Sequence, residues 1–261
     1  MRRVLVSVEP DELYHLAGQS HVGLSFEIPE STCDLTAMGT LRLLEMVQDM
    51  RRKPRFFHAA SSEIFGQPAQ MPQDESTAFA PVNHYGCAKA FATQMVSIYR
   101  KTFGHFAVNG IMFKHESPRR GENFVTRKIC RAAAAIKLGQ QKDLMLGDTS
   151  AKRDWGYAPD YVRGMWLSLQ HATAEDYIFA TGKLHSVQDV VEAAFATMNL
   201  DWRQHVRKDN RLLRPAEPQR LQGNPAKARR LLNWEPSVTF KQMIEDRSEE
   251  HTSELQSRET I

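Results

Sequence analysis

The stretch RFFHAASSEIFG, residues 55–66, carries the clearest sign of the fold. Its first seven residues, Arg55 to Ser61, group their apolar side chains together instead of alternating them, which is typical of a strand covered on both faces. Ser61, Ser62 and Glu63 follow at the end of that strand. Ligands of open parallel sheets bind beyond the carboxyl ends of the strands, so the stretch predicts both a sheet strand and the edge of a site.

Comparable strands precede and follow this stretch. We expect strands at ELYHLA (12–17) and HFAVNGIMF (105–113), and helices at 35–50 and 85–99, where apolar residues recur at helical spacing. Strand–helix–strand alternation at this spacing indicates parallel β-α-β units. We therefore expect an α/β fold, with a doubly wound, Rossmann-like parallel sheet within residues 1–115.

The second half of the chain has a different texture. After a polar, basic segment come an alanine-rich helix, a short strand at DLMLG (143–147) and a helix near HSVQDV (185–190). Ser186 and Asp189 form an approximate capping box at the start of that helix. We expect residues 116–246 to form mainly a smaller C-terminal α/β substrate lobe, with some elements returning to the first domain.

Both ends of the chain depart from a complete dinucleotide-binding domain. Such a sheet binds its cofactor through a glycine-rich turn after the first strand, and no G-x-G-x-x-G or G-x-x-G-x-x-G occurs in this sequence. We therefore expect a partial sheet that lacks its first strands. At the other end, RSEEHTSELQS (247–257) matches the in-frame translation of a common sequencing-library adapter at all eleven codons. Residues 247–261 are therefore set aside as a non-native tail.

Composition narrows the class of protein. With 261 residues, 41% apolar and 25% charged, the chain is long enough for one large domain or two small ones. A net charge of +3, without a basic stripe interleaved with aromatics, argues against nucleic acid. Three widely spaced cysteines argue against a disulfide framework or a metal site and fit the cytoplasm. No apolar run approaches the about 18 residues of a membrane span.

The segment HYGCAK (84–89) places Tyr85 and Lys89 on one helix face. This spacing occurs by chance in many chains, and each residue alone also fits a structural role. A nearby ammonium lowers the pKa of a tyrosine, which can then take a proton from a sugar hydroxyl as hydride leaves the same carbon. Ser61 can hydrogen-bond that oxygen, and Glu63 is an extra base that simple alcohol oxidation does not need. We interpret the ordered set of four residues as catalytic.

Longer motifs resemble one family. The narrowest is HESPRRGENFVTRKI (115–129) followed by RDWGYAPDYV (153–162), and SSEIFG, YGCAK, ATGKLHSVQD, RPAE and NWEPSVTF accompany it. Together they resemble the GDP-mannose 4,6-dehydratase family of the extended short-chain dehydrogenase/reductase superfamily, over about residues 10–246. Y-x-x-x-K marks only the superfamily, whereas the long motif points to the GDP-mannose branch.

The resemblance implies an NADP-dependent lyase of nucleotide-sugar metabolism, in GDP-fucose biosynthesis. Tyr85 would remove the C4 hydroxyl proton of GDP-mannose while hydride passes to NADP+. Glu63 would then remove the C5 proton and help to expel the C6 hydroxyl as water, and hydride would return to C6. The product would be GDP-4-dehydro-6-deoxy-mannose. The implied catalytic residues are Ser61, Glu63, Tyr85 and Lys89.

The resemblance also implies binding residues. Those bordering NADP would be Ala17, Gly18, Ser20, Tyr85, Lys89 and His115. Those binding GDP-mannose would be Val125 and Lys128 near guanine, Arg153, Arg214 and Glu217 at the diphosphate and ribose, and Lys114, at a position that reaches the substrate in the family. Arginine suits this work because its planar fork bonds phosphate oxygens in pairs. For Arg119 and Arg120, solvation at the surface stays an open alternative.

Two departures from the family qualify these expectations. The family usually has asparagine where Lys114 stands, and a lysine there could pair with a phosphate or crowd the sugar. The family also places the glycine-rich loop and two further strands, roughly 60 to 70 residues, ahead of this chain's start. We therefore expect ELYHLA to form an exposed edge and the chain to bind NADP+ poorly, with little turnover. A full-length product would be a homo-oligomer, a dimer or a tetramer.

Two alternatives stay open. One is another nucleotide-sugar epimerase or reductase, against which Glu63 argues because simple redox chemistry does not require that base. The other is a non-catalytic nucleotide-sugar-binding protein that lacks its cofactor half.

Overall fold

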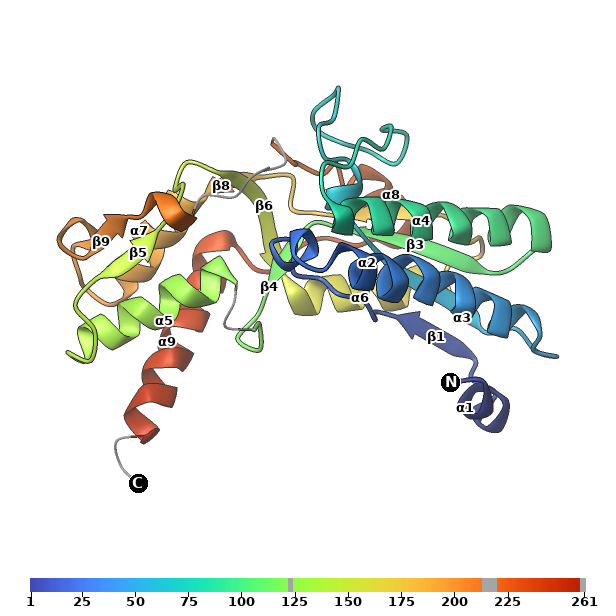
Figure 1. Ribbon diagram of the computed structural model, residues 1–261, viewed down its shortest axis with the longest axis horizontal. Helices are drawn as coiled ribbons and strands as arrows, with labels where there is room; N and C mark the ends of the chain where they lie inside the picture. The colour runs from blue at the N-terminus through green and yellow to red at the C-terminus, as the bar shows by residue number, and fades with distance from the viewer. Residues whose placement is uncertain (122–123, 213–219, 259–261) are drawn as a thin grey trace.

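The computed structural model describes residues 1–121, 124–212 and 220–258. Two lobes lie side by side, one built on a parallel sheet and the other on three packed helices, with β6 (Lys152–Tyr157) between them (Figure 1).

The first lobe is built on a four-stranded parallel sheet in the order β1-β2-β3-β7. The strand bounds are β1 Glu12–His15, β2 Arg55–Ser61, β3 Ala107–Met112 and β7 Asp176–Phe179. The expected parallel α/β architecture is confirmed. The strand β7, which comes from the second half of the sequence, pairs with β3 in this sheet.

Helices cover both faces of this sheet (Figure 1). On one face lie α2 (Pro29–Cys33), the π-helical turn η2 (Asp34–Met38), α3 (Gly39–Gln48) and α4 (His84–Phe103). On the other lie α6 (Ala158–Gln170) and α8 (Ala226–Leu232). Phe56 packs among the α3 and α4 side chains, while the adjacent Phe57 packs against Tyr161 and Met165 of α6. The strand therefore needs apolar residues on both faces, which explains why its sequence does not alternate.

The predicted element ends differ from the observed ones by a few residues. The first strand stops at His15 instead of residue 17, because its last partner on β2 is His58. The predicted helix at 35–50 is interrupted by a π-helical turn before α3 begins. The helix predicted at 85–99 extends to Phe103, where Gly104 ends it with φ 66°, a conformation that glycine adopts readily.

The second lobe packs three helices around its own core. These are α5 (Val125–Lys137), α7 (Val187–Thr197) and α9 (Phe240–Arg258). Two small sheets flank them, with strands β4 Lys114–Glu116, β5 Leu144–Leu146, β6, β8 Leu184–Ser186 and β9 Val206–Lys208. The predicted capping box is confirmed, since Ser186 Oγ accepts from Asp189 N at 3.0 Å and Asp189 Oδ2 accepts from Ser186 N at 2.7 Å. The remaining short helices are α1 Arg2–Val8, η1 Leu24–Phe26, η3 Ser62–Ile64, η4 Trp202–Gln204 and η5 Asn210–Leu212.

The helix α9 runs past Asp246 into the segment 247–261, which is expected to be a non-native tail. Arg247 and Ser248, the first two residues of that segment, are both buried. The Arg247 guanidinium donates to Glu116 Oε2 at 3.0 Å, and Ser248 Oγ donates to the Ile244 carbonyl at 2.8 Å. The Arg247 contact fastens α9 to β4, the strand that begins at Lys114, whereas the Ser248 contact lies within α9.

The strand β1 lies at the edge of the parallel sheet, as expected. Tyr14 on β1 and Leu16 just beyond it are exposed, and α1 contributes one buried side chain, Leu5, to the core at this side. An unpaired strand edge with apolar side chains is a site of unwanted association. Among the described residues, every helix is too short or too polar to cross a bilayer.

Candidate active site

The carboxylate of Glu63 lies where β2 ends. Ser61, the last residue of β2, accepts the Glu63 backbone N–H on its hydroxyl at 3.3 Å and so begins the short helix η3. Glu63 is 2% exposed. Its two oxygens accept hydrogen bonds from Asn83 Nδ2 at 2.9 Å and from Lys114 Nζ at 2.8 Å. Residues from β2, the start of α4 and β4 therefore meet at this acid.

Opposing effects set the pKa of Glu63. Burial raises it, but the positive charge and hydrogen bond of Lys114, the hydrogen bond of Asn83 and the charge of Arg153 together bring it below its ordinary value. The acid is thus held ionised despite its burial, which is the form that a base requires.

The helix α4 brings Tyr85 and Lys89 to the same place. Asn83 caps the helix by accepting the Gly86 N–H at 2.8 Å. A side chain at Gly86 would lie 2.6 Å from the Glu63 carbonyl oxygen, so glycine permits this close approach of helix and acid. Tyr85 and Lys89 are both buried on the sheet side of the helix.

The expectation that Lys89 lowers the pKa of Tyr85 is wrong for this structure. Burial raises the pKa of Tyr85 to about 12, and a hydrogen bond from Ser61 lowers it only in part. Lys89 donates instead to the Ala59 carbonyl of β2 at 2.7 Å. Burial also lowers the pKa of Lys89 to about 8, so the Lys89 ammonium gives up its proton more readily.

A cavity of about 250 Å³ opens over these residues. The structure brings together there five of the six residues expected at the cofactor, namely Gly18, Ser20, Tyr85, Lys89 and His115. Ser61, expected to be catalytic, and Lys114, expected to bind substrate, line the same cavity. Ala17 is exposed and lies between two lining residues. His115 Nδ1 donates to the Phe113 carbonyl at 2.8 Å, and its ring stacks on Tyr161 with ring centres 4.9 Å apart. Burial lowers the pKa of His115 to about 4.

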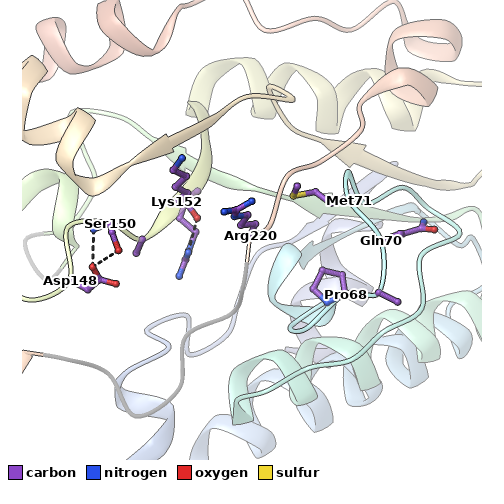
Figure 2. Close-up of a pocket in the computed structure, with 10 residues that line it drawn as sticks. Pro68, Gln70, Met71, Asp148, Ser150, Lys152 and Arg220 are labelled. Atoms are coloured by element: carbon purple, nitrogen blue, oxygen red, sulfur yellow. Dashed lines mark hydrogen bonds between the residues drawn. The ribbon is translucent and has the colours of Figure 1, made fainter.

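Two further cavities continue from this one. Lys114 also lines a cavity of about 360 Å³ that contains Val125 and Arg153, and Arg153 also lines a cavity of about 780 Å³ in the cleft between the lobes. Figure 2 shows the largest of these three cavities, with Lys152 on the β6 side, Met71 on the loop after β2 and Arg220 between them. Because Lys114 and Arg153 each line two of these cavities, the three cavities lie in series from Tyr85 to a basic cleft.

Other expected substrate residues lie elsewhere. Lys128 donates to the Met145 carbonyl at 2.6 Å and does not line these cavities. Arg214 and Glu217 fall outside the described residues. Arg119 is exposed, which agrees with the solvation alternative. Arg120 does not agree with it, because its guanidinium lies 3.7 Å from the Phe124 ring centre and donates to the His115 carbonyl at 2.8 Å.

Sequence reasoning missed two residues of the site. Asn83 stands directly before the α4 helix, and an N-cap signal could have found it, although not its bond to Glu63. Arg220 reaches the basic cleft from a segment without a motif of its own.

A parallel sheet that gathers Ser61, Tyr85 and Lys89 at its carboxyl edge defines a protein of the short-chain dehydrogenase/reductase class. An additional buried carboxylate, Glu63, lies at the same edge and pairs with Lys114. The chain belongs to the GDP-mannose 4,6 dehydratase family, whose sequence profile matches residues 1–247.

Individual relatives agree with this assignment. GDP-mannose 4,6 dehydratase 2 of Arabidopsis thaliana is 46% identical over 265 residues, which covers 100% of this chain and 70% of the relative. The human GDP-mannose 4,6 dehydratase is 43% identical over 263 residues, covering 94% of this chain and 71% of the relative. Among solved structures, RMD from Pseudomonas aeruginosa complexed with NADPH has a TM-score of 0.87 at 24% identity, covering 97% of this chain and 86% of the other; this likeness concerns the fold.

Proposed function

We propose that this chain carries the residues that convert GDP-mannose to GDP-4-dehydro-6-deoxy-mannose with NADP as cofactor; the weak NADP+ binding and low turnover expected from the sequence stay predictions. The observation that carries the proposal is the buried Glu63 carboxylate, held ionised beside the Tyr85 cavity. An alcohol oxidoreductase needs no such base, whereas elimination of water does, because a proton must leave C5. Relatives across several eukaryotes are named for this activity.

The residues of the Tyr85 cavity fit the reactive end of NADP. Its walls are largely apolar, with Ala59, Met112 and Met165 among them, which suits a flat aromatic ring. Tyr85 and Lys89 add a hydroxyl and an ammonium as hydrogen-bond donors. When bound there, NADP+ supplies a hydride acceptor at the start of the reaction and a hydride donor at its end.

The chain's own residues perform the proton transfers. Tyr85 takes the proton of the C4 hydroxyl. Burial raises the Tyr85 pKa to about 12, and the hydrogen bond from Ser61 offsets this in part toward the phenolate form that the step needs. The resulting ketone acidifies C5, and Glu63 removes the C5 proton so that the C6 hydroxyl departs as water. We assign the diphosphate to the basic cleft, where Lys152, Arg153 and Arg220 lie.

Two variants test this assignment. With GDP-mannose and NADP+, Glu63→Gln should still oxidise C4, so that reduced cofactor accumulates, while water elimination falls by about 10³-fold or more. Tyr85→Phe should lose both cofactor reduction and product. Dehydration at the wild-type rate by Glu63→Gln would remove Glu63 from the mechanism and with it the proposal.

Calorimetry separates the dehydratase from a nucleotide-sugar-binding protein without activity. GDP-mannose should bind more tightly when NADP+ is present, because both ligands meet at Tyr85. Binding that ignores the cofactor, together with no turnover, would favour the binding protein.

We also propose a cytoplasmic homo-oligomer. The three cysteines are free thiols, which suits a reducing compartment. The helices on the α3 and α4 side expose apolar residues, among them Leu35, Phe91 and Ile98, which an identical subunit could cover. Sedimentation equilibrium should give a mass above that of one chain; a monomer at micromolar concentration would contradict this.

A further inference from the structure

Lys114 stands between the acid Glu63 and two cavities. It is the first residue of β4, and its ammonium lies 2.8 Å from Glu63 Oε1. The Lys114 side chain is 27% exposed, whereas that of Glu63 is 2% exposed. Lys114 also lines both the cavity over Tyr85 and the cavity toward Arg153. A substrate that reaches Tyr85 through these cavities must therefore pass the ammonium.

The ammonium keeps hydrogen-bonding capacity for a ligand. A lysine has three N–H donors, and in the described part of the chain Glu63 is the one residue that accepts from Lys114. A buried ion pair contributes little to stability by itself, because desolvation offsets attraction. The pairing is thus better explained by chemistry at the cavity than by stability of the fold.

Water elimination needs two proton transfers at neighbouring carbons. A base must take the proton of C5, and an acid must give a proton to the C6 oxygen as it leaves. A carboxylate that is ionised can do the first but holds no proton for the second. Glu63 is held ionised and therefore has no proton to give. The Lys114 ammonium, which donates a hydrogen bond to Glu63, carries one.

We propose that Lys114 is a catalytic acid, which protonates the departing C6 hydroxyl while Glu63 takes the C5 proton. This inference rests on the proposed dehydratase function. The C5–H electron pair forms the C5–C6 double bond, the C6–O bond breaks, and the Lys114 proton completes the water molecule. Glu63 is then protonated and Lys114 neutral, and a proton moving across their 2.8 Å hydrogen bond restores the ion pair.

The remaining protons balance in the last step. As hydride returns to C6, C5 takes up one proton from solvent, and Tyr85 releases to solvent the proton that it took from the C4 hydroxyl. The net change is the loss of one water molecule. The pair would thus divide between two side chains the tasks of base and acid.

The test compares two leaving groups. Fluoride departs without a proton, so GDP-6-deoxy-6-fluoro-mannose needs a base but no acid. Lys114→Met should lower product formation from GDP-mannose by about 100-fold or more, and fluoride release by less than about tenfold. Equal losses with both substrates, or no loss with GDP-mannose, would overturn the proposal.

Lys114→Arg is the matched control. It keeps a cation beside Glu63 but holds its proton too tightly to serve as an acid. It should lose GDP-mannose dehydration as Lys114→Met does; full activity would show that charge alone suffices. If the wild-type chain converts neither substrate, the proposed function fails, and this inference fails with it.

A second readout needs no turnover. Carbon NMR of labelled glutamate follows the Glu63 carboxyl as pH changes, with Glu63→Gln to assign the signal. In Lys114→Met the titration of Glu63 should move to higher pH, and in Lys114→Arg it should stay near the wild-type position. A titration that Lys114→Met leaves unmoved would show that the two side chains are not paired in solution and would overturn the proposal.

Discussion

The Asn83 side chain joins Glu63 to the first turn of α4. Its Nδ2 donates to Glu63 Oε2 at 2.9 Å, and its Oδ1 accepts the Gly86 N–H at 2.8 Å. One amide thus fixes the acid and the start of the helix that carries Tyr85. A substitution at Asn83 should therefore change both the unfolding free energy and the pH dependence of dehydration.

Two substitutions separate these effects. Asn83→Ser keeps a helix cap and should cost about 1 kcal/mol or less in unfolding free energy, whereas Asn83→Ala should cost about 1–2 kcal/mol. Asn83→Asp keeps the cap but sets a second carboxylate beside Glu63, which raises the pKa of that acid. The acidic limb of the dehydration pH profile should therefore move to higher pH in Asn83→Asp. An unmoved limb would mean that Glu63 does not titrate in that step.

Gly86 is expected to resist substitution. An added Cβ would lie 2.6 Å from the Glu63 carbonyl oxygen, so Gly86→Ala should cost about 1–3 kcal/mol and lower turnover. Gly39 in α3 is the control, because its added Cβ would meet the Asp34 carbonyl oxygen at an ordinary 3.7 Å. Gly39→Ala should stabilise by about 0.5–1 kcal/mol. Urea unfolding of both variants checks this, and equal effects would contradict the close approach.

Buried histidines should make the protein sensitive to mild acid. His15 and His58 lie with ring centres 5.6 Å apart, and burial together with the charge of Lys89 lowers the pKa of each. The pKa of His15 falls from 6.5 to about 4, so the unfolded chain takes up its proton first as pH falls. Stability is therefore present above pH about 6.5 and is lost toward pH 4, by about 2 kcal/mol from His15 at pH 5.

His58→Leu tests this acid sensitivity. Within the part of the chain that the structure describes, neither ring nitrogen of His58 has a hydrogen-bond partner. Leucine removes one titrating group and two unsatisfied polar atoms, so the loss of unfolding free energy between pH 7 and pH 5 should become smaller. A steeper loss than in the wild type would contradict the lowered pKa of His58.

The ion pair of Arg247 and Glu116 should contribute to the unfolding free energy of the second lobe. Both side chains are almost fully buried, at 0% and 3% exposed. Arg247→Met leaves Glu116 with a weaker contact to Arg120 at 3.6 Å and should cost about 3 kcal/mol or more. The exposed pair of Arg2 and Asp49, 2.6 Å apart, is the control, and Arg2→Met should change the unfolding midpoint little. Similar midpoints for both variants would contradict the burial of Arg247.

Much of the first lobe could be predicted from local patterns. The apolar run at Arg55–Ser61 and the helical spacing after Asn83 depend on nearby residues, so the strand and the helix follow from the sequence. The hydrogen bond between Ser61 and Tyr85 could also be predicted, because ligands and their binding residues gather at the edge where parallel strands end.

Contacts between distant residues could not be predicted in the same way. Lys114 and Glu63 are 51 residues apart, and the partner of a long, flexible side chain depends on where β4 is placed by the second lobe. The sequence places Lys89 beside Tyr85 on the helix but does not reveal that its ammonium donates to Ala59. The direction of the Tyr85 pKa shift was therefore wrong, since burial outweighs hydrogen bonding there.

The buried ion pair of Arg247 and Glu116 can form only after both residues have been synthesised. The two residues are 131 positions apart, so at about 5–20 residues per second a ribosome needs roughly 7–26 s between them. Until Arg247 emerges, β4 carries an acid without this partner, and Lys114 at its start is not yet fastened by α9. The parallel sheet can form during synthesis, but α9 supports the strand that carries Lys114 only after Arg247 has been made.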